Sequence, residues 1–160
     1  MLKPLVLVVD DEVDLNNDIV ESINKSNKKY EAISAYSAEE ALSSLEKHKV
    51  CFGLGRNCIR FVVLDIKMPG MNGLELLETL REKYKENIGV VMLTAWEDKE
   101  KWDKATAGFV VNYLVKPFDP AKLIEILDRF FEGEEERMIV ETFEKHIEKD
   151  KKYENPASSS

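Results

Sequence analysis

The sequence has few cysteines and no long apolar run. Its two cysteines, Cys51 and Cys58, lie close together near an expected loop. We do not expect a disulfide in a reducing compartment, and we interpret the pair as incidental rather than as a zinc site. No run approaches the roughly 18 apolar residues of a membrane span. The start of the chain, residues 1–4, lacks the features of a secretory signal. These absences predict a cytoplasmic protein without a membrane partner.

An excess of positive charge is also lacking. The chain has 23 Lys and Arg against 31 Asp and Glu, which gives a net charge of −8. A field of that sign repels phosphate backbones, so nucleic acid is not expected as a direct partner.

A hydrophobic fraction of 44% in 160 residues allows a buried core. This length predicts one domain with an appendage.

Predicted strands and helices alternate five times along the chain. Apolar runs that predict buried strands occupy residues 5–9, 30–36, 61–65, 90–93 and 109–115. Predicted helices begin near residues 14, 37, 72, 97 and 119, at cap patterns such as Ser37 with Glu40 and Asn72 with Glu75. This alternation predicts an α/β fold with a doubly wound, five-stranded parallel sheet and right-handed crossovers.

Apolar spacing predicts which helix faces turn inward. The first helix presents residues spaced four apart, and the third presents a similar stripe. The expected inward residues are Leu15, Ile19 and Ile23 in the first helix, and Leu74, Leu77, Leu80 and Tyr84 in the third.

Polar side chains follow four of the predicted strands. Asp10 and Asp11 follow the first, Asp65 ends the third, Thr94 ends the fourth and Lys116 follows the fifth. Because ligands bind beyond the carboxyl ends of parallel strands, we expect these side chains to converge. Crowded carboxylates and a nearby ammonium suit Mg²⁺, which prefers oxygen ligands. Helix capping is an alternative explanation of the two N-terminal aspartates, but it leaves the threonine and the lysine unexplained.

The same set of residues suits formation of an aspartyl phosphate. Asp65 would act as the nucleophile beside Mg²⁺. Phosphoryl transfer requires in-line positioning and neutralisation of the equatorial oxygens, one by the metal, one by Lys116 and one by Thr94. Histidine plays no part, which excludes a triad-type hydrolase.

Four separated motifs carry a family resemblance. Asp10-Asp11, residues 64–73 (LDIKMPGMNG), residues 93–95 (LTA) and residues 113–118 (YLVKPF) together resemble the motif set of two-component response-regulator receiver domains. The resemblance covers residues 4–132 in the family's order. It implies a flavodoxin-like sheet of strand order 2-1-3-4-5, for which the chemotaxis receiver is a standard example.

The resemblance also implies a role for each matching residue. Asp65 would be the phosphoacceptor, and Thr94 and Tyr113 would be the switch pair. Lys116-Pro117 resembles the family's cis peptide. The implied metal ligands are Asp10 (through water), Asp11, Asp65 and the backbone carbonyl of Lys67.

Two segments depart from the common receiver pattern. The loop Lys49–Arg60 is longer than usual before the central strand, and we expect it to lie away from the strand-end site. The helix expected over 97–107 is mostly charged, with Trp102 and Ala105 as its apolar anchors. We therefore predict that this helix shifts easily and belongs to a switching surface.

Residues 133–153 are expected to form an amphipathic C-terminal helix after the receiver (1–132), followed by a flexible tail over 154–160. A helix this short is marginal alone, so its apolar face must be covered. It would fold on the receiver, pair with another subunit, or lead toward an output domain. Flanking residues do not support His146 as a phosphotransfer histidine. The predicted inward stripe is Met138, Ile139, Thr142, Phe143, His146 and Ile147.

The sequence thus predicts a Mg²⁺-dependent phosphoacceptor switch rather than an enzyme. The phosphoryl donor would be a histidine kinase or a phosphotransfer protein, and the output partner is not identified. A homodimer through the last domain helices or the C-terminal helix is left open. One alternative, a Mg²⁺-dependent aspartyl-phosphate phosphatase, requires a second aspartate where Lys67 stands. The other is an interaction module that works without phosphorylation.

Overall fold

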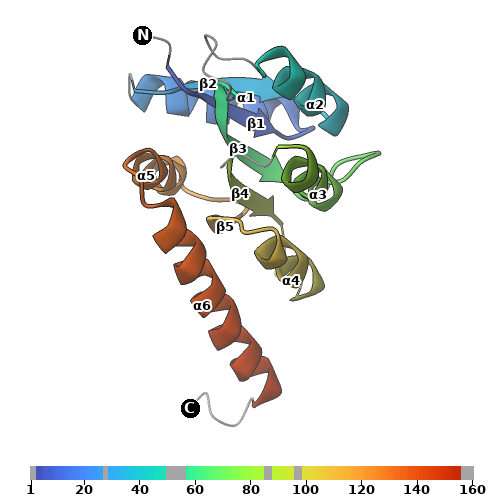
Figure 1. Cartoon of the computed structure of the whole chain (residues 1–160), viewed down its shortest axis with the longest axis vertical. Helices are drawn as coiled ribbons and strands as arrows, with labels where there is room; N and C mark the ends of the chain where they lie inside the picture. Colours follow the sequence, from blue (N-terminus) through green and yellow to red (C-terminus); the bar gives the residue numbers. More distant parts are fainter. Residues whose placement is uncertain (1–2, 27–28, 50–56, 85–87, 96–98, 156–160) are drawn as a thin grey trace.

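The computed structural model describes residues 3–26, 29–49, 57–84, 88–95 and 99–155 and confirms the predicted α/β architecture (Figure 1). Five parallel strands form one sheet in the order β2-β1-β3-β4-β5. The strands are β1 (Leu5–Val9), β2 (Glu31–Ala35), β3 (Ile59–Asp65), β4 (Gly89–Thr94) and β5 (Asn112–Val115). The helices are α1 (Val13–Ser26), α2 (Ala38–Lys47), α3 (Gly73–Lys83), α4 (Lys99–Ala107), α5 (Pro120–Phe131) and α6 (Glu135–Glu154). Among these helices, none is both long and apolar enough to cross a bilayer.

The helices cover both faces of the sheet. Residues of α1 and α5 join one apolar cluster with one set of strand side chains, and residues of α2, α3 and α4 join a second cluster with the opposite set. Strand register aligns Val9 with Leu64 and Asp65 with Leu93. Thr94 pairs with Val115. The polar residues at the ends of these strands therefore share one edge of the sheet.

Helix starts follow the predicted cap patterns, with one difference. Ser37 accepts a hydrogen bond from the Glu40 amide, and Asn72 forms a reciprocal capping box with Glu75. Asp119 caps α5, with Pro120 in its first turn. The first helix begins at Val13, so Asp14 lies inside its first turn rather than at the cap. A carboxylate is favourable in either place because the N-terminal turn carries unpaired amides.

The predicted inward faces are confirmed, although two of the predicted leucines pack against the core without being fully buried. Ile19, Ile23, Leu77, Leu80 and Tyr84 are buried. Leu15 and Leu74, however, are only half-buried, and the fully buried neighbours in their helices are Asn16 and Leu76. The Asn16 amide donates to the carbonyl oxygens of Val8, Asp10 and Ala35, at 2.9 to 3.2 Å. Its burial is therefore supported by three hydrogen bonds.

The fifth strand is shorter than predicted. It begins at Asn112 rather than at Phe109. Phe109 follows Gly108 with a positive φ of 56° and is 56% exposed. An aromatic residue rarely adopts this left-handed conformation, which is incompatible with a strand. The Phe109 ring instead lies 6.0 Å from the ring of Phe143 in α6.

The described ends of the long loop before β3, residue 49 and residues 57–60, lie at the edge of the sheet opposite Asp65. Asn57 is buried, donates to the Leu45 carbonyl and accepts from the Ile59 amide. Residues 50–56, including Cys51, lie outside the described residues. Cys58 is disulfide-bonded, which corrects the expectation that the cysteines are incidental.

The C-terminal helix α6 folds on the receiver, which was one of three alternatives (Figure 1). Met138 and Thr142 are buried, and the Thr142 hydroxyl donates to the Val111 carbonyl at 2.7 Å. Arg129 of α5 pairs with Glu134 at 2.7 Å and with Glu141 at 3.1 Å. Packing and a hydrogen bond next to β5, together with ion pairs to α5, therefore attach the helix.

Part of the predicted inward stripe of α6 is wrong. Ile139, Phe143 and His146 are half-buried, but Ile147 is 50% exposed. This part of the helix contacts α4 through His146 and Lys149, which lie against Asp103 and Trp102, and Ile147 does not share that face. The helix ends at Glu154, one residue later than predicted. The predicted flexible tail lies mostly at 156–160, outside the described residues.

Replacing Thr142 with valine is expected to lower the free energy of unfolding by about 1 kcal/mol, because a buried hydrogen bond between α6 and the start of β5 is lost. Urea denaturation would measure the change. Thr79→Val is the matched control. Thr79 back-bonds to Glu75 one turn earlier, as Thr142 does to Met138, but makes that bond on an exposed helix surface. If both substitutions lowered the free energy of unfolding equally, the hydrogen bond from Thr142 to Val111 would not contribute specifically to the docking of α6.

Candidate functional site

Asp65, Asp10 and Lys116 meet at the carboxyl edge of the sheet. The Lys116 ammonium lies 2.7 Å from Asp10 Oδ2 and 3.4 Å from Asp65 Oδ2. Both carboxylates are buried, whereas the lysine side chain is 15% exposed. Three elements distant in sequence thus place two carboxylates around one ammonium, as predicted.

Local structure explains how Asp65 is positioned. Residues 61–64 are apolar and fully buried, so β3 lies in the middle of the sheet and delivers Asp65 at its end. Helix α3 then starts close to this strand end, where the Gly73 amide donates to the Ile66 carbonyl. A Cβ at Gly73 would lie 2.1 Å from the Asp65 carbonyl oxygen. Only glycine permits this close approach.

The electrostatics of the acidic cluster favour a cation. Burial raises the pKa of Asp65 to about 6, and the neighbouring Asp10 charge adds to the increase. The Lys116 ammonium and the Lys67 amide oppose it. Burial alone would lower the pKa of Lys116, but the hydrogen bond to Asp10 and the surrounding carboxylates raise it overall. Negative charge exceeds positive charge at this site.

The predicted metal ligands fit a small divalent cation. Carboxylate oxygens of Asp10, Asp11 and Asp65 lie within 4.8 Å of one another, and Asp11 is exposed to solvent. Such a set, open on one side, suits Mg²⁺, which keeps several of its waters. The Lys67 amide donates to Asp65 Oδ1 at 3.4 Å. The role of the Lys67 carbonyl as a metal ligand stays a prediction.

The two predicted switch residues lie on neighbouring strands. Thr94 is buried at the end of β4, and its carbonyl accepts from the Lys116 amide at 2.7 Å. Tyr113 is buried in β5, with its ring centroid 3.9 Å from that of Trp102. The Tyr113 hydroxyl is hydrogen-bonded to Thr106 and donates to the Trp102 carbonyl at 3.1 Å. This network ties β5 to α4, and the role of Thr94 and Tyr113 as a switch pair stays a prediction.

Helix α4 has the few anchors that the sequence predicted, together with one that it did not. Ala105 is fully buried and Trp102 is half-buried, as expected. Thr106 is also buried, through its hydrogen bond with Tyr113. The sequence gives no sign of this contact, because it depends on how α4 packs against β5.

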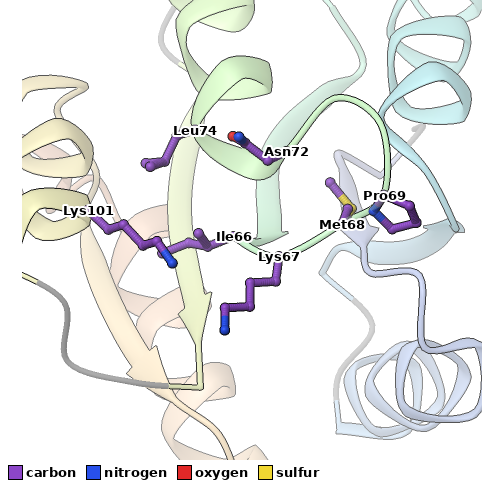
Figure 2. A pocket seen from close by; sticks show the side chains of 7 residues that line it. All are labelled: Ile66, Lys67, Met68, Pro69, Asn72, Leu74 and Lys101. Atoms are coloured by element: carbon purple, nitrogen blue, oxygen red, sulfur yellow. The ribbon is translucent and has the colours of Figure 1, made fainter.

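A cavity of about 410 Å³ lies beside the loop that follows Asp65 (Figure 2). Lys101 reaches from α4 toward this loop, and Lys67 also lines the cavity. The remaining lining residues are Ile66, Met68, Pro69, Asn72 and Leu74. Two lysines therefore border open space beside the loop that follows Asp65.

Two further features complete the description of this edge. The Lys116-Pro117 peptide bond is cis, as the family resemblance implied. Glu12 Oε1 lies 3.5 Å from the Lys116 ammonium, a contact that the analysis of the sequence missed. Its position directly after Asp10 and Asp11 was the available signal.

Comparison with known proteins identifies the class that this fold and site define. Residues 6–128 match the response regulator receiver domain family. The chain therefore belongs to the response regulator receiver domain family, which confirms the resemblance seen in the motifs. Members of this family are generally phosphoacceptor switches rather than enzymes.

Several named proteins and solved structures are similar to this chain. It is 42% identical over 73 residues to chemotaxis protein CheY-3 of Vibrio cholerae, covering 45% of this chain and 56% of that protein. It is 35% identical to the regulatory protein VanR of Enterococcus faecium, covering 74% of this chain and 46% of that protein. The present chain spans about half the length of these two relatives.

The solved structures agree with the family assignment. A CheY-like receiver domain protein from Methanospirillum hungatei superposes with a TM-score of 0.71 at 25% identity, covering 86% of this chain and 98% of that one. Vibrio cholerae CheY4 superposes with a TM-score of 0.67 at 28% identity, covering 80% and 98%. In both comparisons most of the chain is matched by a whole receiver domain.

Proposed function

We propose that this chain accepts a phosphoryl group on Asp65 and switches conformation to control a downstream partner in two-component signalling. Residues 1–132 would form the receiver, and residues 133–153 a docked helix. The donor would be a histidine kinase, a phosphotransfer protein or a small acyl phosphate, and the reaction would take place in the cytoplasm. The observation that carries the proposal is the Lys116 ammonium held between the buried carboxylates of Asp10 and Asp65.

The chemistry follows from the positions of the side chains. An Asp65 carboxylate oxygen attacks phosphorus, and the new O–P bond forms as the donor's N–P or O–P bond breaks. The leaving imidazole or carboxylate takes the electron pair. With a pKa of about 6, Asp65 is largely ionised near neutral pH and able to attack.

Three groups of this chain would handle the transferred charge. Lys116, already 3.4 Å from Asp65, would bind one phosphoryl oxygen, and the Thr94 hydroxyl would donate to a second. Mg²⁺ held by Asp10, Asp11, Asp65 and the Lys67 carbonyl would neutralise negative charge that otherwise repels the donor. Lys67 and Lys101, beside the adjacent cavity, would favour approach of an anionic donor.

Switching would follow a change in the balance between two conformers. A phosphoryl group on Asp65 would draw Lys116 and Thr94 toward it and favour the conformer in which these contacts are made. Lys116 directly follows β5, and Tyr113 lies within that strand. The strand therefore offers a short route from the phosphorylation site to α4 and its neighbour α6.

Intact-mass measurement after incubation with acetyl phosphate tests the proposal. Wild-type protein is expected to gain the mass of one phosphoryl group when Mg²⁺ is present and to gain none after treatment with a chelator. Asp65→Asn is expected to gain none in either condition. Asp11→Asn is expected to lose the Mg²⁺ dependence together with most of the labelling.

The control is an acid outside the cluster. Glu75→Gln changes an exposed carboxylate at the start of α3 and should leave labelling unchanged. A phosphoryl group that persists on Asp65→Asn would overturn the site assignment. Labelling that is equal with and without Mg²⁺ would overturn the metal dependence.

A further inference from the structure

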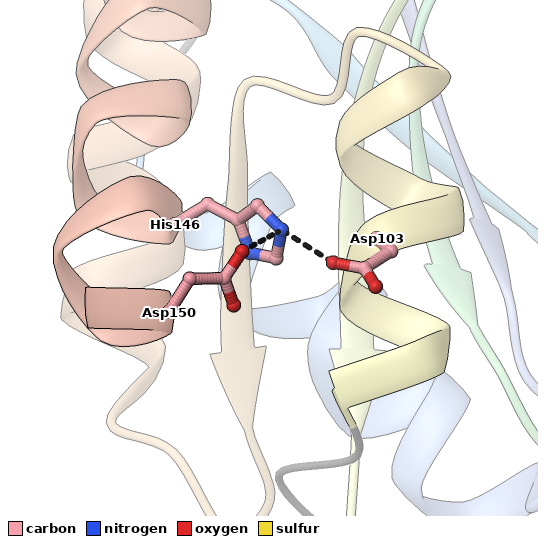
Figure 3. Close-up of side chains that lie close together, drawn as sticks. All are labelled: Asp103, His146 and Asp150. Atoms are coloured by element: carbon pink, nitrogen blue, oxygen red, sulfur yellow. Dashed lines mark hydrogen bonds and ion pairs between the residues drawn. The ribbon is translucent and has the colours of Figure 1, made fainter. Parts of the chain in front are cut away.

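A second group of metal-ligating side chains lies where α6 crosses α4, outside the Asp65 cluster (Figure 3). His146 and Asp150 stand one helical turn apart on α6, and Asp103 faces them from α4. His146 Nε2 lies 2.6 Å from Asp103 Oδ1 and 3.6 Å from Asp150 Oδ2. One donor atom from each residue fits within 4.8 Å. The three side chains therefore point to a common centre.

We propose that Asp103, His146 and Asp150 bind a divalent transition-metal ion of the Zn²⁺ class, which joins α6 to α4. An imidazole with two carboxylates is a donor set typical of zinc, whereas Mg²⁺ takes oxygen ligands. The two carboxylates match the charge of the ion. Three protein ligands leave a fourth position for water, because zinc favours tetrahedral coordination.

The burial of the three side chains suits such a site. The His146 side chain is 12% exposed, so its ring is held by packing. Asp103 is 50% exposed and Asp150 is 32% exposed, which leaves a path for the ion from solvent. Binding would replace the hydrogen bond that His146 Nε2 now shares with Asp103 Oδ1.

The helices are aligned by contacts outside the cluster. The Lys149 ammonium lies 3.7 Å above the Trp102 ring, and Thr142 anchors α6 to Val111. Because Trp102 directly precedes Asp103 and contacts Tyr113, a bound ion would also hold the turn of α4 that packs on β5. Metal binding at this site stands independently of phosphorylation at Asp65.

The test is calorimetric titration of the untagged, chelator-treated full chain with ZnCl₂. To remove the other acidic cluster, the titration is performed in an Asp11→Asn, Asp65→Asn background. One equivalent is expected to bind saturably. At a free concentration about 100 times the dissociation constant, Zn²⁺ should raise Tm by about 5 to 10 °C. His146→Gln and Asp150→Asn should each weaken binding at least about tenfold.

Matched controls are available in the same chain. His48, the other of its two histidines, lies at the end of α2 with Nδ1 2.8 Å from the Ser44 carbonyl. Glu144 is an exposed acid on α6. His48→Gln and Glu144→Gln should bind Zn²⁺ as the parent does. Circular dichroism and the metal-free Tm establish that each variant is folded.

Imidazole NMR resonances locate the ion directly. Zn²⁺ should shift the ring signals of His146 and leave those of His48 unchanged. The proposal is overturned if the double-substituted background binds no Zn²⁺, if His146→Gln binds as tightly as its parent, or if the His48 signals move instead. The cluster would then be an ion pair between two helices only.

Discussion

Replacing Lys116 with methionine is expected to slow phosphorylation of Asp65 by acetyl phosphate at least about 100-fold, because a preorganised positive charge at the transferred group is lost. Methionine keeps the length and apolar stem of lysine. The substitution therefore removes the positive charge that lies between Asp10 and Asp65 in the folded protein. The expected fall in rate reflects the loss of charge neutralisation. Rates would come from intact mass against time at saturating Mg²⁺.

The matched control for this substitution is Lys67→Met. It removes the same charge from the same edge of the sheet, but the side chain of Lys67 is exposed and only its backbone amide contacts Asp65. We expect less than about a fivefold effect, from weaker attraction of the donor alone. Similar losses in both variants would show that the total positive charge at this edge sets the phosphorylation rate. The position of Lys116 between the two carboxylates would then make no separate contribution.

Replacing Asp65 with asparagine is expected to stabilise the metal-free protein by up to about 3 kcal/mol at pH 7. The pKa of Asp65 is raised from 3.8 to about 6 by burial and by Asp10. The folded state therefore binds the proton more tightly than the unfolded state does. Stability falls as the pH rises through the window from about 4 to 6 and stays reduced above it. Asparagine has no charge to bury.

Urea denaturation in a chelator at pH 4, 5, 6 and 7 measures this difference. The variant and the wild type should be nearly equal at pH 4 and should diverge toward pH 7. Titrating groups outside the cluster of Asp10, Asp65 and Lys116 are common to both proteins and cancel in the difference. A constant difference between the proteins across this range would contradict the raised pKa.

The alternation of strands and helices and the convergence at the strand ends could be predicted because both follow from local signals, whereas the strand order came from the family resemblance. Apolar runs and cap patterns define the elements, and a parallel sheet brings its carboxyl ends together. Asp10, Asp65 and Lys116 needed no further information to be placed at one edge. Their separations of 2.7 and 3.4 Å depend on packing and could not be predicted.

The errors occurred where tertiary contacts decide the outcome. The burial of Asn16 was not predicted, because it depends on three carbonyl oxygens that accept from its amide. Phe109 looked like part of a strand, but the turn at Gly108 gives it a left-handed backbone. The neighbours of His146 were not predictable, since no local signal shows that α6 packs against α4.

The docking of α6 has a consequence for how the sheet meets other chains. Strand β5 is the last in the order β2-β1-β3-β4-β5, so among the residues that the structure describes no strand lies on its outer side. Unprotected sheet margins recruit extended segments from other molecules and promote aggregation. With Thr142 bonded to the Val111 carbonyl just before β5, a foreign strand would have to displace the helix before it could extend the sheet there. The docked helix α6 is therefore expected to hinder the addition of a foreign strand next to β5.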